Sequence, residues 1–317
     1  MKKSRRLELY YTLFSLIVDT PWIKPSTIAE YFGHKGRGRS PTTFLRHVRN
    51  MYERKISREP RLTLKPYEGC QTTTYFCRKT SYRGLNAMLS DLSNDKRITY
   101  TILLSGTDFF LTSRESDLNL KNYGLDILEK SKLYTPIYTI PKGWNISMDD
   151  ALEALTHINL KKSLIPRTIY YHFSWSDLDW KIFNVMSESV RTKIAYLARE
   201  TDVDYKTAKD HFFNVVLPSC VIAHYFYPKG YDFYLQLFIR IQSEYEAEIV
   251  KALEELPCTT YVFPLEKELV INLFHENQRK VINLLGKMEE KSIIDGFLLY
   301  APLYCIYPDF KTSEEDK

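Results

Sequence analysis

The sequence predicts an α+β protein in which one unit, a three-helix head followed by a βαββαβ domain, occurs twice along the chain. Three observations support this prediction. The length of 317 residues exceeds that of a single domain. A short stretch near the middle is echoed near the end, and helical and alternating apolar periods follow one another in the same order in both halves.

The echo joins residues 128–141 to residues 290–308. Both stretches are predicted to be the end of a helix followed by a strand whose large side chains alternate. The matched positions are Pro136 with Pro302 and Tyr138 with Tyr304. A repeat of this kind predicts two structurally similar units.

Each half contains the order strand, helix, strand, strand, helix, strand, which is that of a ferredoxin-like domain. In the first half the expected strands are residues 74–78, 98–104, 108–113 and 135–140, and the expected helices are residues 82–92 and 118–130. In the second half the expected strands are residues 233–242, 259–264, 268–274 and 302–306, and the expected helices are residues 244–256 and 277–291.

An all-helical stretch of the size of a helix-turn-helix head precedes each of these domains, at residues 7–57 and 177–221. In the first stretch, Ser40 is expected to cap a helix whose first residue is Pro41, a position where the missing proline N–H costs nothing. Strands at residues 58–65 and 75–78 would add a wing to this head, with residues 66–71 at its tip.

These elements predict six segments. They are a winged helix-turn-helix head at residues 1–72, a ferredoxin-like domain at 73–145, a linker helix and strand at 146–174, a degenerate second helix-turn-helix head at 175–230, a second ferredoxin-like domain at 231–310 and a disordered tail at 311–317.

Positive charge is concentrated at the start of the chain. The whole chain has a net charge of +5, whereas residues 1–65 hold fifteen Lys and Arg against five Asp and Glu, a net of +10. The remaining residues, with 29 basic against 34 acidic side chains, therefore have a net charge of −5. This asymmetry indicates a polyanion as the partner of the first head.

A helix that begins at Pro41 places Phe44, Val48 and Met51 on one apolar face, and these residues are expected to be core. The opposite face and the loop before it carry side chains of the types that reach phosphates and base edges in DNA. The candidate DNA-binding residues are Lys35, Arg37, Arg39, Ser40, Thr42, Thr43, Arg46, His47, Arg49, Asn50 and Arg54. The second head has acidic residues at 200–204, and we expect it to be structural or to contact another chain.

Residues 40–51, Ser-Pro-Thr-Thr-Phe-Leu-Arg-His-Val-Arg-Asn-Met, resemble the recognition helix of the leucine-responsive (Lrp/AsnC, feast/famine) transcription regulators. Residues 178–183 resemble the opening helix of that family, and residues 197–207 have its spacing between the second and third helices. The resemblance implies a tandem duplication of a helix-turn-helix and ferredoxin-like unit. It also implies a transcription regulator that binds double-stranded DNA, forms a homodimer and senses a small-molecule effector.

Two alternatives stay open. The siroheme decarboxylases resemble the same architecture and also combine two such units, and a tetrapyrrole enzyme of this kind would use basic and histidine side chains of the sheets. The candidates here are His224, Arg240 and His275, although no cluster is visible from their spacing. The second alternative is a sequence-independent protein that organises DNA by assembly.

Several classes of protein are not indicated. There is no G-x-x-x-x-G-K, G-x-G-x-x-G or G-x-S-x-G motif, so we expect no enzyme activity and neither a cofactor nor a metal. No apolar run approaches the roughly 20 residues of a membrane helix. The cysteines are five, scattered and never in a C-x-x-C pair, which favours buried thiols in a reducing cytoplasm.

Overall fold

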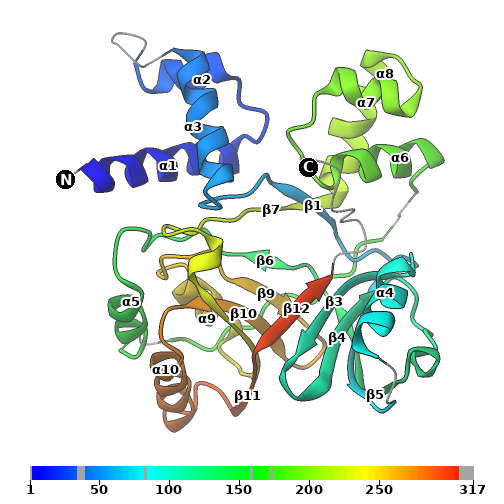
Figure 1. Ribbon diagram of the computed structural model, residues 1–317, viewed down its shortest axis with the longest axis vertical. Coiled ribbons are helices and arrows are strands. Elements are labelled where there is room, and N and C mark those ends of the chain that lie inside the picture. Colours follow the sequence, from blue (N-terminus) through cyan, green and yellow to red (C-terminus); the bar gives the residue numbers. More distant parts are fainter. Residues whose placement is uncertain (1, 34–39, 82–83, 158–159, 172–173, 307–317) are drawn as a thin grey trace.

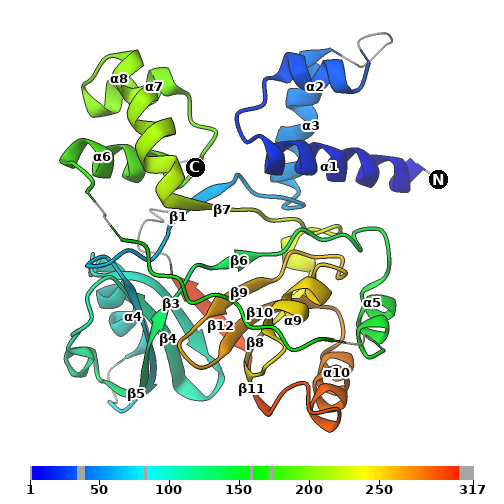
Figure 2. The same ribbon diagram turned by 180° about the vertical axis from the view of Figure 1, so that it is seen from behind.

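The computed structural model describes residues 2–33, 40–81, 84–157, 160–171 and 174–306. Figure 1 shows two helical heads on one side of the molecule and two sheets on the other, and Figure 2 shows the same arrangement from behind. The fold is therefore mixed α and β, with open sheets, as the sequence predicts. The predicted tail at residues 311–317 lies outside the described residues. Among the described residues, no helix is both long and apolar enough to cross a membrane.

Each half begins with a head of three helices. The first head consists of α1 (Lys2–Asp19), α2 (Pro25–Tyr31) and α3 (Pro41–Glu53). The second consists of α6 (Asp177–Met186), α7 (Ile194–Thr201) and α8 (Tyr205–His211), followed by the short turns η3 (Phe212–Val216) and η4 (Leu217–Ser219). Helix α3 begins as predicted, because the Ser40 hydroxyl accepts a hydrogen bond from the backbone N–H of Thr43 at 3.3 Å. Its buried face is Phe44, Val48 and Met51.

The strands that leave the two heads pair with each other. Strand β1 (Arg61–Leu64) runs antiparallel to β7 (Cys220–Ala223). The winged form of the first head is therefore not confirmed, because residues 61–64 pair with the other half of the chain and not with residues 75–78. The apolar side chains beside this ribbon cross between halves: Leu62 is buried in the core of the second head, and Phe226 in the core of the first.

The second sheet has the strand order β11-β8-β10-β9-β6. Its elements are η5 (Tyr231–Phe233), β8 (Leu235–Gln242), α9 (Glu246–Leu253), β9 (Tyr261–Pro264), β10 (Leu269–His275), α10 (Gln278–Glu290) and β11 (Gly296–Tyr300). From β8 to β11 these follow the predicted βαββαβ order, but the fourth strand is residues 296–300 and not 302–306. Helix α5 (Met148–Leu155) of the linker packs beside α10 on the outer face.

The first sheet has the order β12-β3-β4-β2-β5. Its elements are β2 (Thr72–Lys79), α4 (Leu85–Asn94), β3 (Ile98–Leu104), η1 (Ser105–Thr107), β4 (Asp108–Ser113), η2 (Leu120–Tyr123) and β5 (Leu125–Leu133). The helix predicted at residues 118–130 is wrong. Gly124, at φ 74°, ends one turn of 3-10 helix in the left-handed region, and the chain continues as β5 along the whole of β2.

The last strand of each half belongs to the sheet of the other half. Strand β6 (Ile137–Tyr138) pairs with β9, and β12 (Pro302–Ile306) pairs with β3. These are the strands that carry the sequence echo, so the repeat marks an exchange of strands. The prediction of strands in these two segments is confirmed, whereas their placement in their own unit is wrong.

The two sheets face each other through an aromatic contact. The ring of Phe110 lies 5.1 Å from the rings of both Phe76 and Phe238. Beside this contact, the guanidinium of Arg240 lies 3.8 Å from the centre of the Phe76 ring. Helix α4 covers the outer face of the first sheet, and α9 and α10 cover that of the second. The predicted thiols are free: Cys77, Cys220 and Cys258 are buried, and Cys70 and Cys305 are half-buried.

Phe226 belongs to the second half of the chain but packs in the core of the first head, and this crossed packing predicts that it stabilises the first head. Its ring is fully buried against Tyr11 and Phe14 of α1. Phe226→Ala is expected to lower the free energy of unfolding by about 3–5 kcal/mol, because it leaves a cavity in that core. The matched control Phe233→Ala removes a ring that is 53% exposed, and should cost less than about 1 kcal/mol. Equal losses in denaturant unfolding would contradict the crossed packing.

Candidate functional site

The described members of the predicted DNA-binding set lie on α3. Thr42, Arg46 and Arg49 are exposed on its outer side, Arg54 is exposed at its end, and Asn50 is half-buried. The hydroxyls of Ser40 and Thr43 lie 2.9 Å apart and are used at the helix cap. Lys35, Arg37 and Arg39 lie outside the described residues.

His47, predicted on the outer face of α3, turns partly into the core of the head. Its ring lies 6.5 Å from the rings of Tyr10 and Phe44, and its Nδ1 is buried with no hydrogen-bond partner among the described residues. Burial lowers the pKa of His47, and the charges of Arg46 and Arg6 lower it further. At neutral pH this ring is therefore a neutral packing residue of the head.

The three residues named for a tetrapyrrole enzyme lie in three different surroundings. Arg240 is held between the sheets by the carboxylates of Glu268, at 2.7 Å, and Glu129, at 2.5 Å. His275 ends β10 and is 1% exposed, and burial lowers its pKa. His224 lies beyond β7, beside the first head. Arg240 thus acts as a clamp between the sheets, and the three side chains are not brought together.

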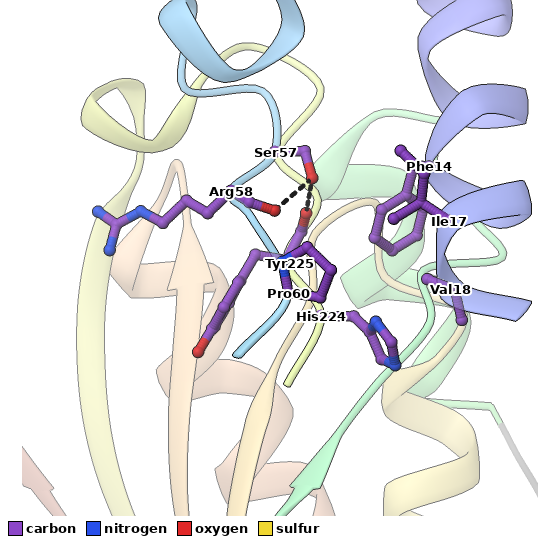
Figure 3. Close-up of a pocket in the computed structure, with 8 residues that line it drawn as sticks. All are labelled: Phe14, Ile17, Val18, Ser57, Arg58, Pro60, His224 and Tyr225. Carbon is purple, nitrogen blue, oxygen red and sulfur yellow. Dashed lines mark hydrogen bonds between the residues drawn. The ribbon is translucent and has the colours of Figure 1, made fainter. Parts of the chain in front are cut away.

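His224 lines a small cavity between α1 and the β1–β7 ribbon, shown in Figure 3. At the wall of the cavity, the Ser57 hydroxyl donates a hydrogen bond to the carbonyl of Tyr225 at 2.6 Å. Its volume is about 10 Å³, which is the space of a single water molecule. Burial lowers the pKa of His224 to about 4, although the carboxylate of Asp19 acts in the opposite direction. This cavity is too small for an organic ligand.

A second pocket, of about 480 Å³, lies beside β2 and β5 in the first sheet. A volume of this size falls within the range of small-molecule sites. The pocket is lined by Gly69, Gln71, Thr73, Arg114, Ser116, Lys130, Ser131, Lys132 and Glu266. We call it the Arg114 pocket, and it is the candidate functional site.

The lining side chains come from both halves of the chain. Lys130 and Lys132 are two residues apart on β5, so their side chains leave the strand on the same side. Arg114 is the first residue after β4, and the Tyr75 hydroxyl fixes the loop that follows by donating to the carbonyl of Ser116 at 2.7 Å. Glu266 comes from the β9–β10 hairpin of the other half, so both halves contribute to the pocket.

The electrostatics of the pocket favour an anion. Three cationic side chains face one carboxylate, Glu266. Lys130 is paired with the exposed Asp117 at 3.2 Å, but no carboxylate among the described residues forms an ion pair with Arg114 or Lys132. Cations without a carboxylate partner in a concave surface raise the local concentration of anionic ligands. The backbone and hydroxyl groups around them can complete the hydrogen bonds of a carboxylate.

Arg114 also connects the pocket to the second head. Its guanidinium lies 5.3 Å from the ring centre of Trp180 and 5.6 Å from that of Phe183, both on α6. Cation–π contacts of this length are attractive and hold a planar guanidinium against a ring. Aromatic side chains of the second head therefore lie next to the cationic Arg114 of the pocket.

This site was not predicted from the sequence. Lys130 was the last residue of a predicted helix, Lys132 fell between that helix and the next predicted strand, and Arg114 lay in a predicted loop. The one available signal was the alternation Lys130-Ser131-Lys132, which is typical of a strand with one basic face. Among the described residues, no group of three or more His, Cys, Asp or Glu side chains is placed to hold a metal ion.

Comparison with known proteins finds structures of similar fold but identifies no family for this chain. No protein-family model and no curated protein matches the chain. Two solved structures are similar to it, and both are of the siroheme decarboxylase NirDL. The complex with an iron-uroporphyrin III analogue has a TM-score of 0.52 at 9% identity, and covers 93% of this chain and 92% of that chain. NirDL alone has a TM-score of 0.51 at 10% identity, covering 94% and 91%.

These matches correct the functional interpretation. They show a fold of the AsnC/Lrp-like ferredoxin class, but nothing places the chain among the Lrp/AsnC regulators. The interpretation as a DNA-binding transcription regulator is wrong, because the chain is similar over nearly its whole length to an enzyme and the matches support no DNA-binding role. The predicted homodimer and effector are not tested and stay predictions.

The low pKa of His224 predicts a dependence of stability on pH. The group has a pKa of about 4 in the folded protein and about 6.5 when unfolded, so the unfolded state takes up a proton first. The free energy of unfolding should therefore fall as pH decreases from about 6.5 to 4, by at most about 3 kcal/mol from this residue. Urea unfolding at pH 7 and pH 5 should show a smaller fall for His224→Asn than for the wild type. The same fall in both proteins would contradict the assignment.

Proposed function

We propose that this protein binds a polycarboxylate tetrapyrrole in the Arg114 pocket and removes carboxyl groups from it as CO2. The observation that carries the proposal is the pair of cations without a carboxylate partner, Arg114 and Lys132, in a pocket of about 480 Å³. The likeness of the fold to siroheme decarboxylase NirDL over 93% of the chain supports the choice of ligand class.

The side chains of the pocket suit the two chemical parts of such a ligand. A guanidinium binds a carboxylate through two parallel hydrogen bonds, and the lysine ammoniums add point charges. The ring of a tetrapyrrole is flat and apolar, and the half-buried Trp180 beside Arg114 offers an aromatic ring for stacking. Arg114 and the lysines themselves are exposed, so the pocket opens to solvent on the side from which a large ring would enter.

The chemistry requires a proton donor in the same place. When a side-chain carboxylate leaves as CO2, the bond between the two carbons breaks and its electron pair stays on the ligand carbon. That carbon then takes a proton. Lys130 and Lys132 are the lining side chains whose ammonium groups can give one, whereas arginine stays protonated. We assign to Arg114 the binding of a carboxylate and to the lysines the delivery of the proton.

Binding is tested first with uroporphyrin III, an octacarboxylate porphyrin, by absorbance titration. Arg114→Ala and Lys132→Ala are each expected to weaken binding by about tenfold or more, because each removes a charged hydrogen-bond donor. Arg199→Ala is the matched control, because Arg199 is exposed on α7 and paired with Glu200. Binding that is unchanged in both pocket variants, or absent in the wild type at low salt, would reject the site.

Activity is tested separately by the release of CO2 from siroheme. Lys130→Arg and Lys132→Arg keep the charge but remove the group that can give a proton. Whichever of the two lysines donates the proton, its arginine variant should lose about 100-fold or more in kcat, while its affinity for the ligand stays within about threefold of the wild type. If the wild type binds the tetrapyrrole and releases no CO2 under reducing or oxidising conditions, the protein is a binder and the decarboxylation step is rejected.

A further inference from the structure

The two units of the chain can be compared residue by residue because their central strands share a short motif. Phe76-Cys77-Arg78 of β2 corresponds to Phe238-Ile239-Arg240 of β8. Phe76 and Phe238 face each other across the contact between the sheets, with ring centres 6.3 Å apart. Because Phe76 and Phe238 occupy equivalent positions, the residues of one unit can be aligned with those of the other.

This register shows what stands in place of Arg114 in the second unit. The residues directly opposite the two motif arginines are Asp108 for Arg78 and Val270 for Arg240. Six residues further along the chain come Arg114 in the first unit and Glu276 in the second. A carboxylate therefore occupies the position of the guanidinium.

Glu276 has a local partner of its own. Its carboxylate accepts a hydrogen bond from the ammonium of Lys229 at 2.6 Å, and that ammonium lies 4.6 Å from the ring centre of Phe233. The charge of the Lys229 ammonium is thus already neutralised by Glu276. A carboxylate ligand that approached it would meet a like charge, which disfavours binding.

The lysines of the pocket also have no equivalent on the second sheet. In the first unit, Lys130 and Lys132 follow Glu129, which is opposite Phe76. In the second unit the residue opposite the equivalent phenylalanine is Tyr300, the last residue of β11. Beyond it the chain crosses to the first sheet as β12, so no strand continues to carry basic residues there.

From these differences we infer that the protein binds one polycarboxylate ligand per chain, in the first unit, and that the second unit is a half in which binding is blocked. The inference rests on the proposed function and adds its stoichiometry and asymmetry. The second unit still takes part, because its β9–β10 hairpin supplies Glu266 to the wall of the Arg114 pocket. The repeated architecture thus makes one composite site and not two equal ones.

The test is to count ligands per chain in the intact protein. Native mass spectrometry with uroporphyrin III in excess, together with titration calorimetry, should give one ligand per chain. Arg114→Glu puts the second unit's side chain into the first, and should weaken binding more than about tenfold. Glu276→Gln is the matched control in the second unit, and should keep one ligand per chain with the affinity changed by less than about twofold.

The outcomes separate the two proposals. Two ligands per chain, or one ligand whose affinity is lost in Glu276→Gln and kept in Arg114→Glu, would overturn the single-site inference and leave a tetrapyrrole-binding function in place. No ligand on the wild type at any concentration up to the solubility of the porphyrin would overturn both.

Discussion

The exchange of one strand between the halves is the constraint on which the rest of the structure depends. Strand β6 completes the second sheet and β12 completes the first, so neither sheet is built from its own half alone. The β1–β7 ribbon repeats the exchange at the level of the heads, where Leu62 and Phe226 each fill the core of the other half's head. Because burial of these residues is shared, the halves are expected to fold as one cooperative body. The Arg114 pocket, with Glu266 in its wall, also draws its residues from both halves.

Features that depend on neighbours along the chain could be predicted from the sequence. The cap at Ser40, the apolar face of α3 and strands β3, β4 and β10 follow from local spacing and capping chemistry. Residues 118–130 could not be assigned correctly, because the buried Leu118, Leu120 and Leu125 suit a helix and a strand equally well. The left-handed conformation of Gly124 is what ends the helical turn before the strand. The alternation at Tyr138 predicts a strand, but the same alternation suits either sheet. Pairing between distant strands is not encoded in a local period.

The site was harder to predict than the fold. Arg114, Lys132 and Glu266 are far apart in the sequence and meet only when β5 is a strand and the two halves are joined. The concentration of positive charge in residues 1–65 indicated a polyanion partner, but net charge describes association in general and does not identify a ligand. On α3 positive charge is carried by Arg46 and Arg49, which are exposed. A shared fold hosts different functions, so the function must be argued from the pocket.

The central claim is that a cationic pocket built by both halves holds a tetrapyrrole in the first unit. The most direct test is a crystal structure of the protein with uroporphyrin III bound. Density for the macrocycle is expected beside Trp180, with ligand carboxylates in hydrogen-bond contact with Arg114 and Lys132 and no second ligand near Glu276. Density for the porphyrin on any other surface, with the Arg114 pocket holding only solvent, would contradict it.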